Sequence, residues 1–575
     1  MWLSEISIDN YRVIGRVRVG FDASTVLIGE NDVGKTAILD ALAAVLGPWP
    51  HGSPQFSESD IHQAPNRGAG PPAHIAIDLR FAERTPGEWD VPACARVCAA
   101  AGRAGKGPRS FTLGLRVNAS SLKQHWVVRN AQGLESAADA ALIADVRRLC
   151  PLIQTRSRGM FGLGAALAAR SNGSTELDRL AQAVGHYWAS LDAGEGGDAE
   201  RNLNAGYAAA RQLLLRSIPG LGLEDGPSRE HIAAIVGDLP VSDANTLRLP
   251  VSGTASRKIA MLLIAAALVR DGAGALAPEA RPLLLIEDPE AHLHPMTLAA
   301  LWGLLEPISL QKIVTTQSGD LLAAAPLKAL RRLVRHGGEL AAFQVDPLRF
   351  KADELRKFGY HLRVRNGVAT FARCWLFVEG ETEFWALSEL ARVLGYDLAQ
   401  EGVACVEFAQ CGLDPLIKMA QALHIQWHVL ADGDRSGQVY GESTRRLLGD
   451  DPVSERLTLL HDKDIEHCFW NHGFDRVYRD AAGVPPTGYG APHRVISRAI
   501  GRRSKPGLAF AIIAEVAERG AESIPAPLAQ VIQTCVRLAR ESPQRALAAH
   551  AEHDIDRGAK KAGRALQKRL RHAGC

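Results

Sequence analysis

Acidic residues that follow apolar runs are the first candidates for chemistry in this sequence. Glu379 comes directly after CWLFV, and Asp432 and Asp434 follow the run that ends in HVLA. Residues two apart on an extended chain point to the same side, so the two aspartates are expected to aim together. Glu383 lies four residues after Glu379, one helical turn away. Clustered carboxylates without cysteine suit Mg²⁺ or Mn²⁺, and pairs of such ions catalyse phosphoryl chemistry.

The elements around these acids predict a parallel sheet. A strand and a helix are expected within 374–394, a second strand within 402–412, a second helix at 417–424 and a third strand before Asp432. A further strand within 457–470 is expected to bring Glu466. Sites in parallel sheets lie at the carboxyl ends of the strands, so these acids should meet there. By itself, an Asp-x-Asp pair is also typical of a turn whose side chains cap backbone amides.

A glycine loop near the N-terminus predicts a nucleotide site. The apolar run TVLIG is typical of a central strand, and it leads into GENDVGKT. Gly29, Gly34, Lys35 and Thr36 fit the pattern G-x-x-x-x-G-K-[ST], and Asn31 is a further candidate contact in the same loop. In such loops backbone N–H groups surround phosphate, the lysine reaches the terminal phosphates and the threonine hydroxyl holds Mg²⁺. ATP with Mg²⁺ is therefore expected here.

A second apolar run also ends in acids, in the stretch RPLLLIEDPEAHLHP. In P-loop ATPases the first carboxylate at such a strand end orders the Mg²⁺ shell and the second polarises the attacking water. The usual order is Asp then Glu, whereas here Glu287 precedes Asp288. Glu287 is therefore expected to serve the metal, and the shorter Asp288 to position water from further back.

Two more stretches complete the candidate nucleotide site. Ser252 and Gly253 open a long apolar helix, and free amides at a helix start can bind a γ-phosphate that a second subunit presents. A plain helix N-cap is the alternative for this pair. The stretch KIVTTQSGDLL is predicted to be a strand whose end carries Thr315, Thr316 and Gln317.

These pieces together resemble the ATPase heads of the ABC class, in the branch that contains RecF, SMC proteins and the OLD (overcoming lysogenization defect) nucleases. The stretches IDNYR, GENDVGKT and IEDPEAHLHP look like the OLD version. In that family the last strand usually ends in Thr-Thr-His-Ser, with the histidine on the γ-phosphate. Gln317 stands in its place. Glutamine can hydrogen-bond a phosphate but carries no charge, so slow ATP turnover is expected.

The C-terminal motifs VEGETE and ADGDRSG resemble the Toprim domain of topoisomerases, primases and OLD nucleases. The resemblance implies a two-metal site built from Glu379, Glu383, Asp432, Asp434 and Glu466. The stretch GRRSKPGLAF is similar to the OLD segment that carries an active-site lysine, which would be Lys505. The EGETE form and the basic C-terminal part look like the stand-alone class. Such proteins are typically homodimers, and some act in defence against phage.

Composition limits the classes of function. The chain has 575 residues, too many for one core, and its 66 basic and 63 acidic residues leave a formal net charge of +3. A polyanionic partner therefore needs a local basic patch, for which 556–572 is the candidate and a solvated helix face the alternative. Nine scattered cysteines indicate reduced thiols. No signal peptide is evident, and the longest apolar run, IAMLLIAAALV, is too short to span a bilayer. A cytoplasmic protein is expected.

We therefore expect an α/β protein in four segments. These are the first part of an ABC-type P-loop ATPase head (1–165), a helical insertion that is a candidate dimerisation element (166–235), the second part of the head (236–370) and a Toprim nuclease domain (371–575). The expected activity is that of an ATP-binding, divalent-metal-dependent DNA endonuclease. It would hold DNA through the phosphate backbone and act as a homodimer. The alternative is a RecF-like or SMC-like DNA-binding repair ATPase whose Toprim fold does not cleave DNA.

Overall fold

The computed structural model describes 1–47, 54–63, 74–102, 107–156, 159–161, 279–290, 298, 302, 306, 310–361, 367–485 and 490–573. It divides into two compact units, an N-terminal unit from Met1 to Ala342 and a C-terminal unit from Phe343 to Cys575. Several predicted features lie outside the described residues: the helical insertion at 166–235, Ser252 and Gly253, and the apolar run at 259–269.

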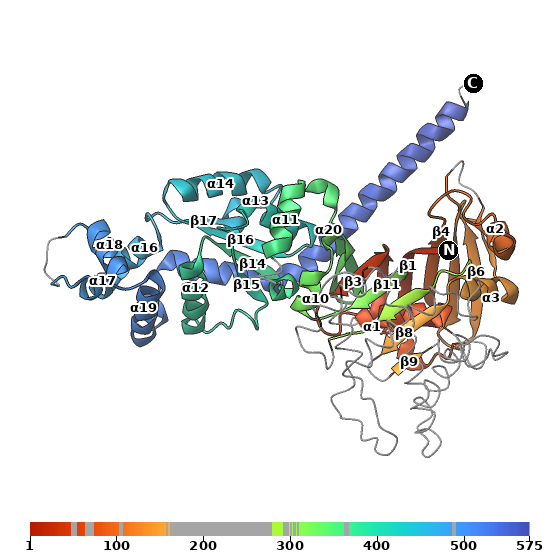
Figure 1. The fold of residues 1–575 in the computed structure, drawn as a ribbon, viewed down its shortest axis with the longest axis horizontal. Helices are drawn as coiled ribbons and strands as arrows, with labels where there is room; N and C mark the ends of the chain where they lie inside the picture. The colour runs from red at the N-terminus through yellow and green to blue at the C-terminus, as the bar shows by residue number, and fades with distance from the viewer. Residues whose placement is uncertain are drawn as a thin grey trace, which may run out of the picture. The chain divides into compact units, whose positions relative to one another are not determined.

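The N-terminal unit is built on one large sheet, coloured red to green in Figure 1. Among the described residues its strands follow the order β7-β6-β5-β4-β1-β2-β13-β12-β3-β11-β10-β8-β9. The strands are β1 (Trp2–Tyr11), β2 (Ile14–Gly20), β3 (Ser24–Ile28), β4 (His74–Ala82), β5 (Ser110–Asn118), β6 (Gln124–Asn130), β7 (Glu135–Ala137), β8 (Leu152–Arg156), β9 (Gly159–Phe161), β10 (Leu283–Ile286), β11 (Gln311–Thr315), β12 (Leu330–His336) and β13 (Glu339–Gln344). The described helices of this unit are α1 (Lys35–Leu46), α2 (Ala95–Ala101), α3 (Ala140–Leu149) and α10 (Gly319–Ala324).

The sheet has an antiparallel part and a parallel part. Strand β1 pairs antiparallel with β2 and β4, whereas β3 pairs in parallel with β11 and β12, and β10 pairs in parallel with β11 and β8. All four residues of β10 are buried, as is typical of a parallel strand that is covered on both faces. Helix α1 is also buried along most of its length and joins the same core. The glycine loop between β3 and α1 therefore joins two buried elements.

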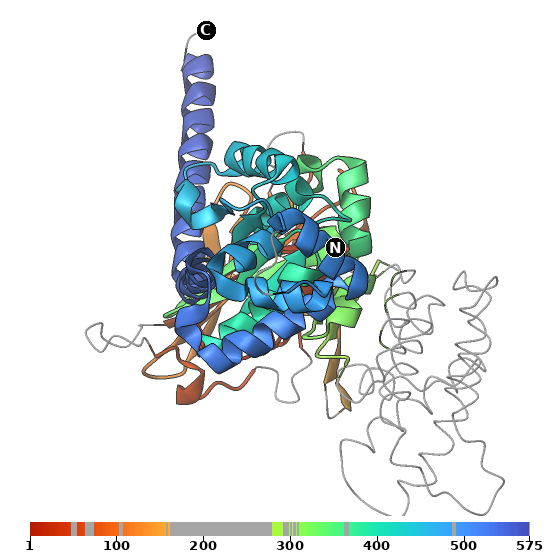
Figure 2. The ribbon, with the colours of Figure 1, turned by 90° about the vertical axis from the view of Figure 1, so that its left-hand side faces the viewer.

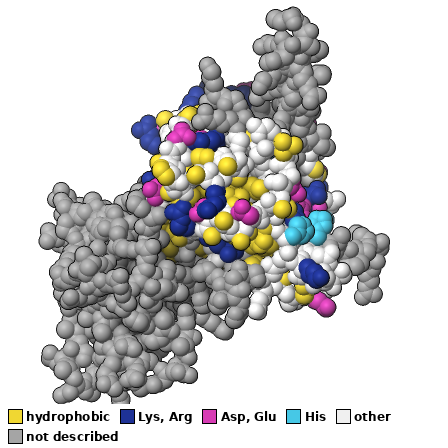
Figure 3. Space-filling view, turned by 90° about the vertical axis from the view of Figure 1, so that its right-hand side faces the viewer, with side chains coloured by type: hydrophobic (Ala, Val, Ile, Leu, Met, Phe, Trp, Pro, Cys, Tyr) yellow, Lys and Arg dark blue, Asp and Glu magenta, His cyan; other side chains and the backbone are white. Residues whose placement is uncertain are grey.

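The face of the N-terminal unit that carries α2 and α3 shows charges of both signs. Basic and acidic side chains lie next to one another there, among hydrophobic ones, across the described part of the surface (Figure 3). Several of them are paired: Arg96 with Asp145 at 2.8 Å, and Arg129 with Glu135 at 2.7 Å. The described part of this face therefore carries charges of both signs rather than one.

The C-terminal unit contains a four-stranded parallel sheet among its described residues, in the order β15-β14-β16-β17. The strands are β14 (Cys374–Val378), β15 (Val403–Glu407), β16 (Gln426–Ala431) and β17 (Leu457–Leu459). The helices are α11 (Ala352–His361), α12 (Glu381–Val393), α13 (Leu413–Ala422), α14 (Arg435–Leu447), α15 (Val453–Arg456), α16 (Ile465–Phe469), α17 (Asp475–Ala482), α18 (Pro492–Arg502), α19 (Lys505–Arg519) and α20 (Ala526–Ala573), and a kink at Trp470–Phe474 separates α16 from α17.

Helices cover both faces of this sheet. Figure 1 shows α13 and α14 on one face and α12 on the other, where the first part of α20 also packs against β14 and β16. Helices α17, α18 and α19 gather at one end of the unit, which faces the viewer in Figure 2. The fold confirms the predicted α/β class, with parallel strands and helices in alternation. Among the described helices, none is both long and apolar enough to cross a membrane.

Candidate active sites and family

The glycine loop joins β3 to α1, as the motif predicts. Its first glycine, Gly29, has a φ of 155°, and a Cβ added there would lie 2.7 Å from the carbonyl oxygen of Leu333. Gly34 also has a positive φ, of 117°, and stands directly before α1. Only glycine adopts these conformations without strain, so the loop geometry depends on both. Asn31 and Thr36 are exposed, as groups that contact a nucleotide need to be.

Lys35 is buried and folds over its own loop. Its ammonium group donates to the carbonyl oxygens of Gly29 at 2.8 Å and Glu30 at 2.9 Å. Burial lowers the pKa of Lys35 below its ordinary value, and the carboxylates of Asp288 and Glu290 oppose that shift. The lysine is therefore set between its loop and the acids that follow β10.

The acids after β10 divide their contacts in a way that the sequence did not predict. Asp288 has a φ of 38°. Its carboxylate accepts from the Thr315 hydroxyl at 3.1 Å, and its backbone N–H donates to the oxygen of that hydroxyl, also at 3.1 Å. Glu290 accepts from the Thr316 hydroxyl at 2.9 Å and from the backbone N–H of Gln317 at 2.5 Å. Glu290 therefore connects the segment after β10 to the segment after β11, which carries Gln317, through hydrogen bonds.

Glu287 is partly buried beside these residues, but Asp288 and Glu290 are the downstream acids that act on Lys35. Burial also raises the pKa of Glu290. The sequence held one signal for this residue, the third acid in the stretch EDPE. Because its partners lie more than twenty residues away in sequence, the pattern alone did not single it out.

In the C-terminal unit, two acids leave neighbouring strands at the same edge of the sheet. Strands β14 and β16 are adjacent and parallel, with Phe377 opposite Val429. Glu379 follows β14, and Asp432 follows β16. One carboxylate oxygen of Glu379, Oε2, is buried and has no hydrogen-bond partner among the described residues. A buried oxygen without a partner is costly unless a cation or donor meets it.

Two further acids begin the helices that follow these strands. The backbone N–H of Gly380 donates to Glu383 Oε2 at 3.0 Å, so this side chain folds back over the start of α12. Asp434 Oδ1 accepts from the backbone N–H of Gly437 at 2.8 Å and caps α14. The capping role considered for the Asp pair thus applies to one oxygen of Asp434. The same residue also acts electrostatically on Glu379, so it belongs to the acid cluster as well.

Gly433, between the two aspartates, permits a close approach of backbone. A Cβ added there would lie 2.6 Å from the carbonyl oxygen of Leu460 and closer still to that of Asp462. The Gly433 N–H donates to this Asp462 oxygen at 3.1 Å. The loop after β17 is therefore fixed against the loop that carries Asp432 and Asp434.

Glu466 reaches the cluster by a different route from the one predicted. Strand β17 ends at Leu459, and Glu466 lies on α16 and not on a strand. The chain turns into this helix because the Asp464 side chain accepts from the backbone N–H of His467 at 2.8 Å and caps it. Glu466 is buried at 4% exposure. Asp464, which acts electrostatically on Asp432, is an acid that the sequence motifs did not single out.

Lys505 is the basic residue that meets these acids. It is the first residue of α19, which Ser504 caps by accepting from the Gly507 N–H at 3.3 Å. The Lys505 ammonium lies 3.0 Å from Glu466 Oε1. Burial acts to lower the pKa of Lys505, but the surrounding acids outweigh it and raise the pKa. The side chain is about half exposed, so it can also meet a group that arrives from solvent.

The electrostatics of the cluster indicate an excess of negative charge. Burial raises the pKa of Asp432 to about 8, and the carboxylates of Glu383 and Glu379 add to this shift. Burial also raises the pKa of Glu379, with Asp434 as the next cause, and that of Glu383. One lysine does not balance this many acids. Carboxylate oxygens without cysteine, one of them buried and unbonded, fit a hard divalent cation such as Mg²⁺ or Mn²⁺.

Comparison with known proteins decides the family. The model of the family described as "Protein of unknown function (DUF2813)" matches residues 1–369. The chain belongs to this DUF2813 family. It is 33% identical over 568 residues to the "Uncharacterized protein YbjD" of Escherichia coli (strain K12). This match covers 94% of this chain and 99% of that relative. The family described as "Overcoming lysogenization defect protein-like, TOPRIM domain" matches residues 370–434, a span that includes Glu379, Asp432 and Asp434. The predicted likeness to OLD proteins is thereby confirmed.

Solved structures resemble parts of this DUF2813 protein. An SMC head bound to the C-terminal winged-helix domain of ScpA is 13% identical and covers 61% of this chain and 99% of its own, with a TM-score of 0.37. An SMC head domain from Thermotoga maritima is 15% identical, with coverage of 60% and 100% and a TM-score of 0.33. The C-terminal region of the Burkholderia pseudomallei OLD protein is 20% identical, with coverage of 29% and 98% and a TM-score of 0.25.

Proposed function

We propose that this protein is an ATP-binding, divalent-metal-dependent DNA endonuclease. The observation that carries the proposal is the meeting of Glu379 and Asp432 at the ends of adjacent parallel strands, with Glu466 and Lys505 beside them. A structural role alone does not explain such a group, because clustered buried acids repel one another and cost stability. The group is stable when cations bind to it.

The cluster assigns a role to each side chain. Glu379, Asp432 and Glu466 would hold the divalent ions, with Glu383 and Asp434 each contributing the oxygen that does not cap a helix. When bound, such ions activate water and stabilise the oxygen that leaves the phosphorus. Lys505 would donate to the phosphate as negative charge develops on it. Its present partner, Glu466, holds the ammonium group at the edge of the cluster until then.

Exposed aromatic rings beside the cluster favour a nucleic acid as the substrate. Trp385 on α12 is 41% exposed and Phe510 on α19 is 52% exposed, and their ring centroids lie 6.3 Å apart. These two helices also carry Glu383 and Lys505. Exposed aromatic side chains of this kind stack on unpaired bases. We infer that DNA lies across α12 and α19, with its backbone also held by the basic end of α20.

The ATP site is proposed to regulate this activity. Lys35 would bind the terminal phosphates and Thr36 the accompanying Mg²⁺, and Glu287 and Asp288 are candidates to order the metal and the attacking water. Glu290 would set the position of Gln317, because it bonds the backbone N–H of that residue. Ser252 and Gly253 are proposed to contact the nucleotide of a second subunit, which makes the active form a homodimer.

Nicking of supercoiled plasmid tests the nuclease proposal. The wild-type protein is expected to nick DNA with Mg²⁺ or Mn²⁺ and not with a chelator. Asp432→Asn and Glu379→Gln keep the size of each side chain and remove its charge, so both should lower nicking to the metal-free background. Glu401→Gln is the matched control, because this acid pairs with Arg540 away from the cluster and should leave nicking unchanged.

ATP binding separates the two sites in the same experiment. Both cluster variants should bind a fluorescent ATP analogue as the wild type does, since Lys35 lies in the other unit. Full nicking by both variants would refute the nuclease assignment. Loss of nicking together with loss of ATP binding would indicate misfolding, in which case an Asp432→Glu variant with shifted metal dependence would decide.

A further inference from the structure

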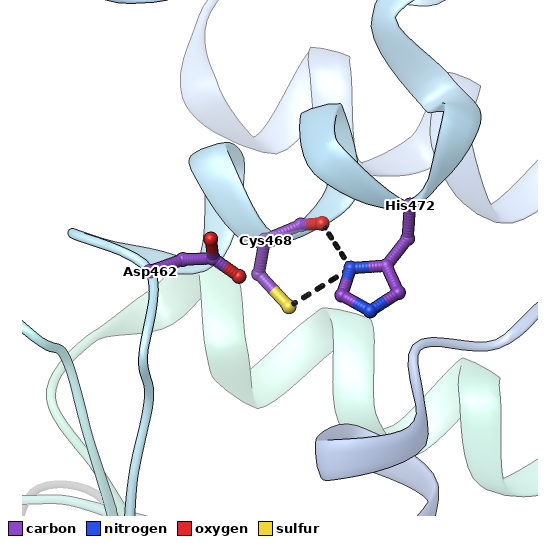
Figure 4. Close-up of side chains that lie close together, drawn as sticks. All are labelled: Asp462, Cys468 and His472. Atoms are coloured by element: carbon purple, nitrogen blue, oxygen red, sulfur yellow. Dashed lines mark hydrogen bonds between the residues drawn. The ribbon is translucent and has the colours of Figure 1, made fainter.

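Three side chains of different chemistry meet just beyond the carboxylate cluster. Asp462 lies in the loop after β17, Cys468 on α16 and His472 in the kink at Trp470–Phe474, and Figure 4 shows them pointing toward one another. One ligand atom from each lies within 4.8 Å of the other two. Cys468 Sγ lies 3.9 Å from His472 Nδ1. A carboxylate, a thiol and an imidazole at this spacing form a set that differs from the oxygen-only cluster nearby.

The spacing is close to that of a tetrahedral metal site. Metal–sulfur and metal–nitrogen bonds of about 2.3 and 2.0–2.1 Å around zinc place the two ligand atoms about 3.6 Å apart. The observed separation of 3.9 Å needs only a small contraction. Sulfur and imidazole ligands select zinc-like ions and not Mg²⁺, so this group would not compete for the ions of the carboxylate cluster.

The local backbone is built around this group. Cys468 lies on α16, and His472, four residues later, lies in the kink that follows this helix. The helix changes at this point: His472 has φ −99° and ψ 21°, and Gly473 has a φ of 89°. The irregular turn lets the His472 ring return toward Cys468, and Nδ1–H donates to the Cys468 carbonyl oxygen at 2.7 Å, a hydrogen bond that has to break before Nδ1 can bind an ion.

A neighbouring side chain orients the third ligand. Asn471 Nδ2 donates to Asp462 Oδ1 at 2.6 Å, the kind of outer bond that fixes a ligating carboxylate. Cys468 is fully buried, Asp462 is half-buried and His472 is exposed. The group is therefore closed to solvent at Cys468 and open to solvent at His472, where an ion and a water molecule can enter.

We propose that Asp462, Cys468 and His472 bind one zinc-class divalent cation, with the fourth position open to water. Three protein ligands and one open position are a common arrangement for zinc. The Cys468 thiol gives its proton to solvent on binding. If Nδ1 is the ligand, the imidazole proton moves to Nε2, so the ring stays neutral. The ion supports the carboxylate cluster, because the Asp462 carbonyl accepts from Gly433 and Glu466 lies on the same helix as Cys468.

Cobalt binding tests this site without any activity assay. The full-length protein is stripped with a chelator and titrated with Co²⁺ in excess Mg²⁺, which occupies the carboxylate cluster. We expect one tightly bound Co²⁺ per chain and the near-ultraviolet absorption band of a thiolate–cobalt bond, which Zn²⁺ then displaces. Cys468→Ser should abolish the band, and His472→Gln, which removes a direct ligand, should weaken binding by more than the about 10–100-fold that loss of an outer-shell partner costs. Cys411→Ser, which removes another buried thiol of this unit, should change neither.

Each outcome decides the proposal. Cobalt bound without the thiolate band would place the ion on carboxylates and overturn it, as would no tight binding at all. A band that persists in Cys468→Ser would also overturn it. If Cys468→Ser fails to fold, the exposed His472→Gln variant and the isosteric Asp462→Asn variant decide. Unchanged affinity in both refutes the site, whereas weaker binding in both supports it.

Discussion

The raised pKa of Asp432 predicts that the metal-free protein loses stability as pH rises. The ordinary pKa of this carboxyl is 3.8, and in the folded protein it is about 8. Between these values the folded state holds a proton that the unfolded state has released, so a higher pH favours unfolding. The penalty is absent below the unfolded pKa, grows through this window and levels off above the folded pKa.

The size of the effect follows from the same values. One proton of difference costs about 1.4 kcal/mol per pH unit, so a rise from about pH 5.5 to about 7.5 removes up to about 2.7 kcal/mol. Solvent screening at this half-buried carboxyl reduces the expected loss to about 1–2 kcal/mol. For a unit of this size, that loss lowers the melting temperature by about 2–8 °C.

Scanning calorimetry of the chelator-treated protein at both pH values measures this loss. Asp432→Asn cannot ionise, so its transition should move little between them. Saturating Mg²⁺ should also remove the fall, because the cation stabilises the ionised carboxylates. Glu401→Gln, an acid outside the cluster, should behave as the wild type does. An equal or higher melting temperature at the higher pH, or a full fall in Asp432→Asn, would refute this account of the cluster.

Four further predictions concern other parts of the chain. Gly433→Ala should push two loops apart and lower the free energy of unfolding in denaturant by about 1–3 kcal/mol. Gly501→Ala is the control: its added Cβ meets nothing within 4 Å, so it should stabilise the protein by up to about 1 kcal/mol. Equal effects of the two substitutions would contradict the close approach at Gly433. Gln317→His should raise ATP turnover in a phosphate-release assay, and a slower variant would show that the glutamine does not limit the rate. Alanine at Trp385 and Phe510 should weaken single-stranded DNA binding by about 1–3 kcal/mol per stacked base, and unchanged affinity would move the DNA elsewhere. Replacing four basic residues of α20 by alanine should weaken DNA binding uniformly and flatten its salt dependence by up to about one unit per contact removed, whereas an unchanged slope would leave a solvated helix. These residues are Lys560, Lys561, Lys568 and Arg569.

The sequence predicted best those features whose physics is local. The glycine loop needs a strand, a tight turn and a helix in immediate succession, and all three are in the expected order around Lys35. Glu379 and Asp432 could be placed at the carboxyl ends of strands because apolar runs mark buried parallel strands directly. Their adjacency followed from strand–helix alternation, and β14 and β16 are neighbours.

The features that the sequence missed depend on contacts between distant segments. Glu290 bonds Thr316 and Gln317, and Asp464 acts on Asp432 through space, so no local pattern identifies either role. Glu466 was expected on a strand because its segment begins with an apolar run. The strand ends early because a capping aspartate starts a helix, and such short-range competition is difficult to predict from apolar runs alone.

The order of the large sheet has a consequence for how this family can vary. Strand β10 pairs in parallel with β8, although the chain between them runs from residue 157 to residue 282 and adds only the short β9 to the described sheet. Strands β3, β11, β10 and β8 are neighbours in the sheet, so their mutual pairing places the ends of β3 and β10. This pairing does not depend on how long the chain between β8 and β10 is. Relatives that differ in that segment would therefore keep Lys35 and Asp288 at the sheet, but would differ in the contacts proposed for Ser252 and Gly253.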